Sequence, residues 1–247
     1  MYTMSLWIEK NVLIPEEYLG YDVVTSEDGN VLGIASIHST DNLGLITVYQ
    51  NINSEYIRYG NDIFVDLDPS GLDPSGNHIL SISLSYDGNT LAVGNPTTQQ
   101  DNKIIVYTFY EGSWIQKGNK ITPVYDGLTT LDIFVSGLSL SLSGNGSTLA
   151  ISSRITDPFG GGGDPFGGGG DPFGGGGDPF GGGGDPFGGG LLTQSESQYN
   201  YQVSIYQWDG ITWSGLNTFT SDLSGVSFAP CKLSADASTL AIGSYDT

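Results

Sequence analysis

The sequence predicts an all-β fold, a β-propeller built from four-stranded antiparallel blades. Three observations support this prediction: a hairpin motif that recurs four times, a pair of aromatic residues seven positions apart that follows it, and a repeat period of 58 to 59 residues. A fixed period of this size with several short strand signals per unit is typical of propeller blades. No segment shows helical periodicity with capping residues.

The hairpin motif is clearest in SLSYDGNTLAVG at residues 83–94. It recurs as SLSGNGSTLAIS at 141–152, as KLSADASTLAIG at 232–243 and, less closely, as VTSEDGNVLGIA at 24–35. The aromatic pairs follow the three copies nearest the N-terminus, at Tyr49 and Tyr56, Tyr107 and Trp114, and Tyr206 and Trp213. The chain is therefore predicted to contain about four repeats.

Each repeat predicts four strands. Serines alternate with large apolar residues along 81–86 and 138–143, the period of a strand with one buried face. Asp87–Asn89 tolerates positive φ and predicts a tight hairpin into a second strand. A third strand ends near Tyr107, and a turn containing glycine leads into a fourth strand at Trp114. Four antiparallel strands make one blade.

One long insertion interrupts the last repeat interval. The turn residues Gly146 and Ala237 lie 91 residues apart, and 34 of the residues between them are the tract DPFGGGG, written five times with the final glycine missing. Without this tract, at 157–190, the interval returns to 57 residues. We therefore predict a single propeller domain over residues 1–247 with a low-complexity insertion.

The motifs carry a family resemblance. The pattern SLSxDGNTLAIG, a loop and then VxIYQWxGxxW resembles the FG-GAP-like β-propeller repeats of surface proteins from bacteria, algae and giant viruses. VSIYQWDGITW at 203–213 and SLSYDGNTLAVG are the closest matches, and the resemblance covers the chain outside the insertion. It implies a propeller fold, whereas such blades serve adhesion, binding, scaffolding and occasionally catalysis. The acidic calcium loop of integrin-like repeats is present in no copy.

The two ends predict a split blade. Trp7–Asn11 aligns with Trp114–Gly118, so it is expected to be an outer strand, whereas the last copy stops after its second strand. An open strand edge leaves backbone amides unpaired. Three arrangements follow: a four-bladed ring with an irregular closing blade, a fragment of a longer propeller, or an open unit whose gap a neighbouring copy fills. In the third case a contact that does not close produces a filament.

Charge and composition limit the partners. The chain has 7 Lys and Arg against 27 Asp and Glu, a net charge of −20. Nucleic acid is not an expected partner, because phosphate binding requires the opposite sign. The N-terminus lacks a secretory signal pattern, and no run is long enough to span a membrane. Acidity, a single cysteine and many Ser, Thr, Gly and Asn favour an extracellular, cell-surface or virion-surface location without membrane insertion.

Aspartates in the loop after the second strand of successive blades are weak candidates for a calcium site. These residues are Asp41, Asp101, Asp157 and Asp246. Calcium binds several oxygen ligands, and the fold could bring these loops to one face. Aspartate is also common in turns for purely conformational reasons. No other cofactor is expected.

The insertion and one turn supply two further candidate sites. Phenylalanine recurs at Phe159, Phe166, Phe173, Phe180 and Phe187. Exposed rings on a glycine-rich chain favour self-association, although replication slippage in a permissive loop is the simpler origin of the tract. Asn145-Gly146-Ser147 is a glycosylation sequon in a predicted hairpin turn.

No residue is predicted to be catalytic. Cys231 is the single cysteine and is expected to be a buried thiol, while His38 and His78, the only histidines, lie in no nucleophile motif. We therefore expect a non-enzymatic structural or assembly protein of a cell or virion surface that polymerises head to tail through its incomplete blade. The alternative is an adhesin-like binding propeller that recognises a glycan or a protein through its acidic loop face, with or without calcium.

Overall fold

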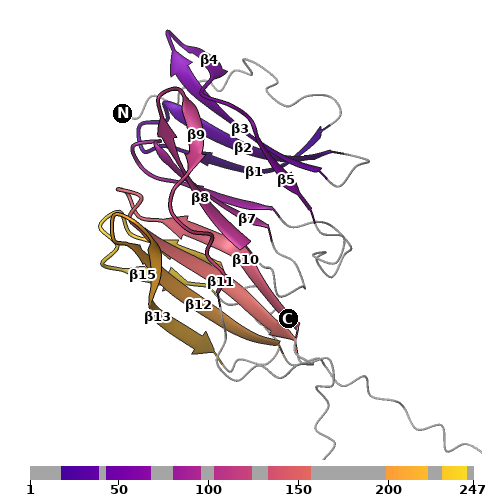
Figure 1. Ribbon diagram of the computed structural model, residues 1–247, viewed down its shortest axis with the longest axis vertical. Helices are drawn as coiled ribbons and strands as arrows, with labels where there is room; N and C mark the ends of the chain where they lie inside the picture. The colour runs from indigo at the N-terminus through magenta and orange to yellow at the C-terminus, as the bar shows by residue number, and fades with distance from the viewer. Residues whose placement is uncertain are drawn as a thin grey trace, which may run out of the picture.

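The computed structural model describes residues 18–38, 43–67, 80–95, 103–123, 133–156, 199–221 and 230–243. Within these ranges all helical and strand structure is β-strand, so the all-β prediction is confirmed. The strands form four antiparallel sheets that follow one another along the chain (Figure 1).

The first sheet, called sheet I, contains β1 (Tyr18–Thr25), β2 (Val31–His38), β3 (Leu43–Ile52), β4 (Glu55–Arg58) and β5 (Ile63–Asp66). Its strands are ordered β1-β2-β3-β4, and β5 also pairs with β3 beyond the end of β4. The two-residue turn between β3 and β4 has positive φ at Asn53 (54°) and Ser54 (69°), the geometry of a tight hairpin.

The next two sheets each contain four strands in sequential order. Sheet II contains β6 (Ser81–Leu84), β7 (Thr90–Asn95), β8 (Lys103–Tyr110) and β9 (Ser113–Gln116). Sheet III contains β10 (Ile133–Leu142), β11 (Thr148–Thr156), β12 (Tyr199–Trp208) and β13 (Trp213–Ser221). The predicted four-stranded antiparallel units are thus confirmed.

The fourth sheet, sheet IV, contains β14 (Cys231–Leu233) and β15 (Leu240–Ile242). No strand pairing among the described residues connects sheet IV to sheet I. The predicted outer strand at Trp7–Asn11 and the insertion at 157–190 lie outside the described residues. The blade count and the split blade therefore stay predictions.

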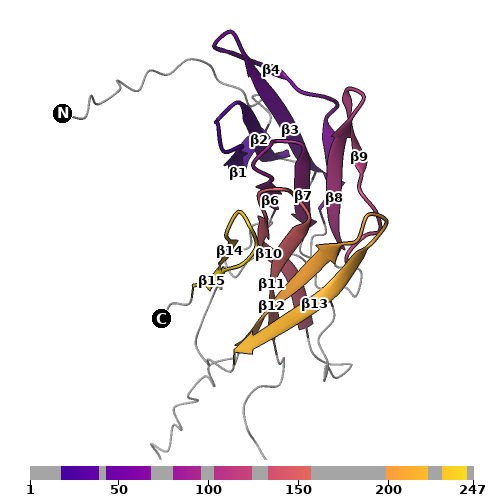
Figure 2. The ribbon, with the colours of Figure 1, turned by 90° about the vertical axis from the view of Figure 1, so that its left-hand side faces the viewer.

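The sheets pack face to face, with their first strands β1, β6, β10 and β14 in succession along one side (Figure 2). Apolar clusters fill the joints between neighbouring sheets: Ile46 and Leu91 lie in the first, Ile104 and Leu149 in the second, and Val203 in the third. Each fully buried side chain of this kind stabilises the fold by about 1.5–3 kcal/mol.

The alternating serines of β6 lie between two sheets and not on a solvent-exposed face. The pattern along β6 predicts one buried face, but all four of its side chains are buried, because sheet II is packed between sheets I and III. A two-residue period shows that the two faces of a strand differ in polarity. It does not show whether the polar face meets water or another sheet.

Side-chain hydrogen bonds stabilise the recurring hairpin turn. The Ser85 hydroxyl donates to Asp87 Oδ1 (2.6 Å) and accepts a hydrogen bond from the Thr90 amide (2.9 Å), while the Asn89 amide donates to Asp87 Oδ1 (3.0 Å). Gly88 has φ of 71°. Equivalent serine-to-Asx bonds join Ser26 to Asp28, Ser143 to Asn145 and Ser234 to Asp236. The motif is therefore a turn in which the serine and Asx side chains form hydrogen bonds with each other and with backbone amides.

Candidate functional site

A groove of about 520 Å³ runs along the first strands of the four sheets. We call it the inner groove. Residues of β1, β6, β10, β14 and β15 contribute to its wall, among them Asp22, Val24, Ser81, Ile82, Ser139, Leu140, Cys231 and Lys232. Its volume lies within the range of small-molecule sites, about 300–1,000 Å³. The inner groove is therefore the candidate functional site.

Serines on the inner strands bond to the neighbouring sheet. The Leu142 amide donates to Ser83 Oγ (2.9 Å), and the Leu233 amide donates to Ser141 Oγ (2.9 Å). The Cys231 amide donates to Ser139 Oγ at 3.3 Å. An innermost strand has no strand partner on its free edge, so its buried amides need other acceptors. The serines supply these acceptors, and we call them capping serines.

Asp22 takes the same role in sheet I. Its Oδ2 accepts a hydrogen bond from the Ile82 amide of sheet II (3.1 Å), and its Oδ1 accepts one from the Val23 amide (2.8 Å). Burial raises the pKa of Asp22 above its ordinary value, while these two hydrogen bonds and the charge of Lys232 act in the opposite direction. Both oxygens are engaged by backbone amides, so this carboxylate is a structural acceptor.

Cys231 is buried, as expected from the sequence, with 4% of its surface exposed. Its thiol lies 3.7 Å from the carbonyl oxygen of Ser139, and burial raises its pKa to about 11. Because the thiolate is the reactive form, this cysteine is unsuited to nucleophilic chemistry near neutral pH. His38 is the last residue of β2, opposite Tyr18, and His78 lies outside the described residues.

The sequence predicts metal-binding and self-association residues in segments beyond the described ranges. Asp41, Asp101, Asp157 and Asp246 lie outside the described residues, as do Phe159, Phe166, Phe173, Phe180 and Phe187. Within the part of the chain that the structure describes, no group of three or more His, Cys, Asp or Glu side chains could hold a metal ion. Both assignments remain predictions.

Asn145 lies in the hairpin turn where the sequence places it, and its side chain is exposed. Its Oδ1 accepts hydrogen bonds from the Ser143 hydroxyl (2.9 Å) and the Ser147 amide (3.0 Å). The glycosylation site remains a prediction.

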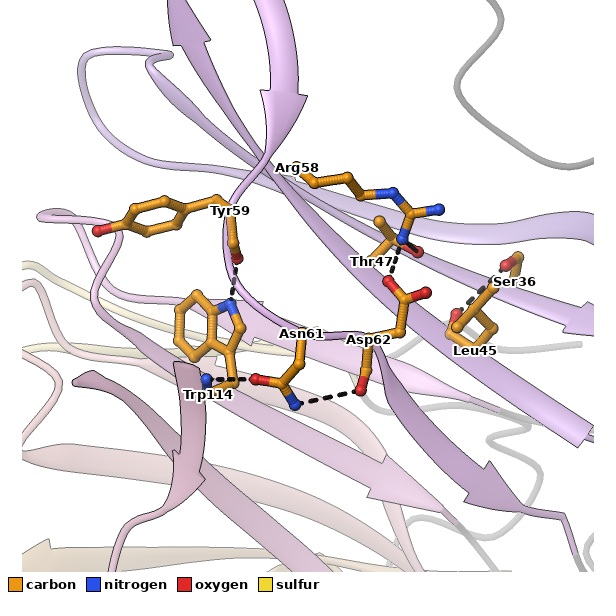
Figure 3. Close-up of polar contacts among 8 residues, drawn as sticks. All are labelled: Ser36, Leu45, Thr47, Arg58, Tyr59, Asn61, Asp62 and Trp114. Carbon is orange, nitrogen blue, oxygen red and sulfur yellow. Dashed lines mark hydrogen bonds and ion pairs between the residues drawn. The ribbon is translucent and has the colours of Figure 1, made fainter. Parts of the chain in front are cut away.

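Two tryptophans form hydrogen-bonded contacts between neighbouring sheets that the sequence patterns did not predict. The indole N–H of Trp114 donates to the Tyr59 carbonyl (2.7 Å), and its backbone amide donates to Asn61 Oδ1 (2.7 Å) (Figure 3). Asn61 follows Gly60, which has φ of 88° and lies in the turn between β4 and β5. We call this arrangement a tryptophan clamp, since residues of one sheet hold the tryptophan of the next.

A second clamp joins sheets II and III. The indole N–H of Trp213 donates to the Lys117 carbonyl (3.0 Å), and its backbone amide donates to Asn119 Oδ1 (2.7 Å). Asn119 follows Gly118, which has φ of 77°. The signal in the sequence was the Gly-Asn pair that recurs at the same distance after Tyr56 and Trp114.

Further aromatic contacts stabilise both tryptophan clamps. In the first, Tyr59 stacks on Phe109 with ring centroids 3.8 Å apart. In the second, the Lys117 ammonium lies over the rings of Trp208 (5.5 Å) and Trp213 (5.7 Å), and burial lowers the pKa of this lysine. Cation–π contacts of this type contribute about 0.5–2 kcal/mol. The clamps fix the outer strands, as the capping serines fix the inner ones.

No protein-family model matches the chain, and no curated protein matches its sequence. Among solved structures, an acylaminoacyl peptidase from Pyrococcus horikoshii is similar at 10% identity and a TM-score of 0.41, covering 83% of this chain and 25% of that one. The periplasmic gluconolactonase of Pseudomonas aeruginosa is similar at 14% identity and a TM-score of 0.34, covering 91% of this chain and 57% of that one.

The chain thus spans a quarter of the peptidase and just over half of the gluconolactonase. Both likenesses are too distant to bear on the activity of this chain. No membrane-spanning helix occurs within the ranges that the structure describes.

Proposed function

We propose that this chain is a non-catalytic structural protein, an open segment of β-propeller that serves as an assembly unit at a cell or virion surface. One observation carries the proposal: polar groups of the inner groove are used to join neighbouring sheets. Asp22, Ser83, Ser139 and Ser141 all accept hydrogen bonds from backbone amides of the following sheet. A catalytic groove needs polar groups directed at a substrate.

The arrangement of the sheets supports the propeller interpretation. Each of sheets I to III places its first strand beside the inner groove and its fourth strand on the outside, as the blades of a propeller do. Sheets II and III have the four strands of a complete blade. Under this interpretation sheet IV supplies the two inner strands of a further blade.

Electrostatics also favour a structural role. Lys232 is the one basic side chain among the described residues that line the inner groove, and Cys231 is held as a neutral thiol near neutral pH. Propeller enzymes need several groups to stabilise developing charge in the transition state. The net charge of −20 suits a soluble surface protein and disfavours nucleic acid as a partner.

The test is the assembly state of the full chain, measured by sedimentation velocity and electron microscopy of natural and recombinant material. We expect regular oligomers or filaments with one repeating copy, and no turnover with panels of esters, lactones, peptides and glycosides. A monodisperse monomer at all concentrations would contradict the assembly role. Turnover that Asp22→Asn abolishes would contradict the non-catalytic role.

The alternative function, ligand binding, is supported by the volume and lining of the inner groove. Its volume of about 520 Å³ and its mixture of a charged residue, Lys232, with apolar Val24 and Leu140 suit a small amphipathic ligand or a short peptide. A glycan array and thermal-shift assays, with calcium and with a chelator, test this function. A ligand whose binding Lys232→Met removes would favour it over a purely structural role.

A further inference from the structure

The outer strand of sheet III is longer than the outer strands of sheets I and II. β13 has 9 residues, whereas β4 and β9 have 4 each. In sheets I and II the outer strand is followed by a Gly-Asn pair, Gly60-Asn61 or Gly118-Asn119, whose glycine has positive φ. In sheet III the same positions hold Asn217-Thr218, and the strand continues to Ser221. The length of β13 therefore follows from its own residues.

The backbone groups of Thr218 and Thr220 point to the open edge of β13. The Trp208 amide donates to the Ser147 carbonyl beside β11, so the odd-numbered residues of β12 bond towards β13. Ile205 pairs with Asn217 beyond the bulge in β13, so the odd-numbered residues there bond back to β12. Among the described residues β13 pairs with β12 alone, on the outside of sheet III (Figure 2).

The open edge is exposed even on the side where a neighbouring sheet lies. The Thr218 hydroxyl is 3.5 Å from Ser204 Oγ, and Ser204 pairs with Ile151 of the core between sheets II and III. Thr218 and Thr220 are exposed nonetheless. In sheet II, which has a sheet on each side, Ile115 of the outer strand is 46% exposed. Exposure of an outer strand is thus a property of the rim of the stack.

The edge carries no charge in a strongly acidic chain. Residues 211–221 contain no Asp, Glu, Lys or Arg, whereas the whole chain has a net charge of −20. The short outer strand β4 contains Glu55 and Arg58, and Lys117 directly follows β9. Charged side chains on an edge strand hinder its pairing with another strand. β13 is therefore the outer strand that a second acidic copy can approach with the least repulsion.

We propose that β13 pairs with β13 of a second copy of this chain, antiparallel and symmetric about Phe219. Thr218 of each copy then lies opposite Thr220 of the other and exchanges backbone hydrogen bonds with it, while the two Phe219 rings are neighbours. Thr–Thr and aromatic pairs stabilise antiparallel strands, so this edge is complementary to itself. The inference rests on the proposed assembly role and names its contact surface. The contact is two-fold, so it closes as a dimer.

The first experiment measures the assembly of the full chain by sedimentation velocity over a concentration series. The double variant Thr218→Glu with Thr220→Glu places like charges opposite each other on both sides of the axis. It should raise the half-dimerisation concentration at least about tenfold, since like charges across an interface disfavour association. Thr218→Glu with Thr220→Lys places opposite charges there and should dimerise at least as well as the natural sequence. Ser113→Glu, at an exposed site on β9, is the matched control and should change nothing.

The results separate this proposal from the assembly role. If the natural sequence assembles and both double variants behave like Ser113→Glu, pairing through β13 is wrong while the assembly role stands. If both double variants fail equally to dimerise, the axis at Phe219 is wrong. If the natural sequence stays monomeric at every concentration, pairing through β13 and the assembly role are both wrong.

Cross-linking and hydrogen exchange then identify what covers the edge. In a Cys231→Ser background, Phe219→Cys should give a disulfide-linked dimer on mild oxidation, because the two residues are opposite each other at the axis. Exchange of the Thr218 and Thr220 amides should slow as the protein concentration rises. Slow exchange at every concentration would place another part of the same chain on this edge and overturn the second copy. Dimers that do not cross-link would overturn the register.

Discussion

Trp114 donates its indole N–H to the main-chain carbonyl of Tyr59, 2.7 Å away in the neighbouring sheet. Trp213 makes the equivalent bond to Lys117 at 3.0 Å, and both tryptophans are 4% exposed. The aromatic residue that marks the start of the fourth strand in the sequence is thus the point at which one sheet holds the next.

Replacing Trp114 by Phe should destabilise the protein by about 1–3 kcal/mol, because the Tyr59 carbonyl loses its indole partner in a part-buried site. Trp213→Phe should have a similar effect. Urea unfolding followed by circular dichroism measures the change. Tyr110→Phe, at a side chain that is 59% exposed, is the control and should change stability by less than about 0.5 kcal/mol. Equal effects of all three variants would contradict the clamp.

Alanine at the turn glycines should distinguish backbone strain from contact between sheets. Gly29 and Gly88 have φ of 70° and 71°, so alanine costs about 1–2 kcal/mol at either position. A Cβ on Gly88 would lie 2.6 Å from Val31, whereas one on Gly29 meets nothing within 4 Å. Gly88→Ala should therefore be worse than Gly29→Ala by about 1–3 kcal/mol in urea unfolding. The opposite order would show that the joint between sheets I and II is looser than described.

Acid should weaken the last hairpin turn through Asp236. The Ser234 hydroxyl, together with the amide and hydroxyl of Ser238, lowers the pKa of this exposed carboxyl from 3.8 to about 2. The folded pKa is the lower one, so this contribution to stability is present above pH 3.8 and is lost as the pH falls through about 2. The Tm advantage of the natural sequence over Asp236→Asn should shrink in this window. Asn145 already occupies the equivalent position in sheet III, so the variant keeps the turn.

The Cys231 thiol should give the opposite pH dependence. Burial raises its pKa from 9.0 to about 11, so its contribution is complete below pH 9.0 and is lost as the pH rises through about 11. The stability difference between the natural sequence and Cys231→Ala should fall by about 2 kcal/mol across this interval. A thiol reagent at pH 8 should react slowly with folded protein and rapidly in urea. Rapid reaction of the folded protein would contradict the buried position.

Deleting residues 157–190 should leave the fold intact. Thr156 at the end of β11 pairs directly with Tyr199 at the start of β12, so the segment between them leaves and returns at adjacent strand ends. In sheet II the equivalent ends, Asn95 and Lys103, are joined by seven residues, and the deletion would leave eight. We expect a Tm within about 2 °C of the natural sequence, because loop length has a small effect on stability. Loss of assembly on deletion would give the five phenylalanines a role in self-association.

The repeat predicted the fold closely because it combines three independent local signals. The Asp-Gly-Asn turn, alternation and aromatic spacing located β6, β7, β8 and the start of β9, and the equivalent strands of sheet III. Positive φ at Gly29, Gly88, Gly146 and Ala237 agrees with the expected turn chemistry. These features depend on residues within a few positions of one another.

The functions of the polar residues could not be predicted in the same way. Ser83 and Ser141 were placed on a polar face, yet they cap amides 59 and 92 residues away in the chain. Asn61 and Asn119 follow glycine and therefore look like turn residues, although each holds a tryptophan of the next sheet. Contacts between sheets depend on how the sheets stack, which a local pattern does not encode.

Because every joint links a sheet only to its immediate neighbours, the free energy of folding is distributed as in a linear array. A sheet in the middle is held from both sides, while sheet IV, with its two short strands, is held by sheet III alone among the described residues. Unfolding should therefore begin by fraying from the C-terminal end, and amide hydrogen exchange should slow progressively from β15 back to β7.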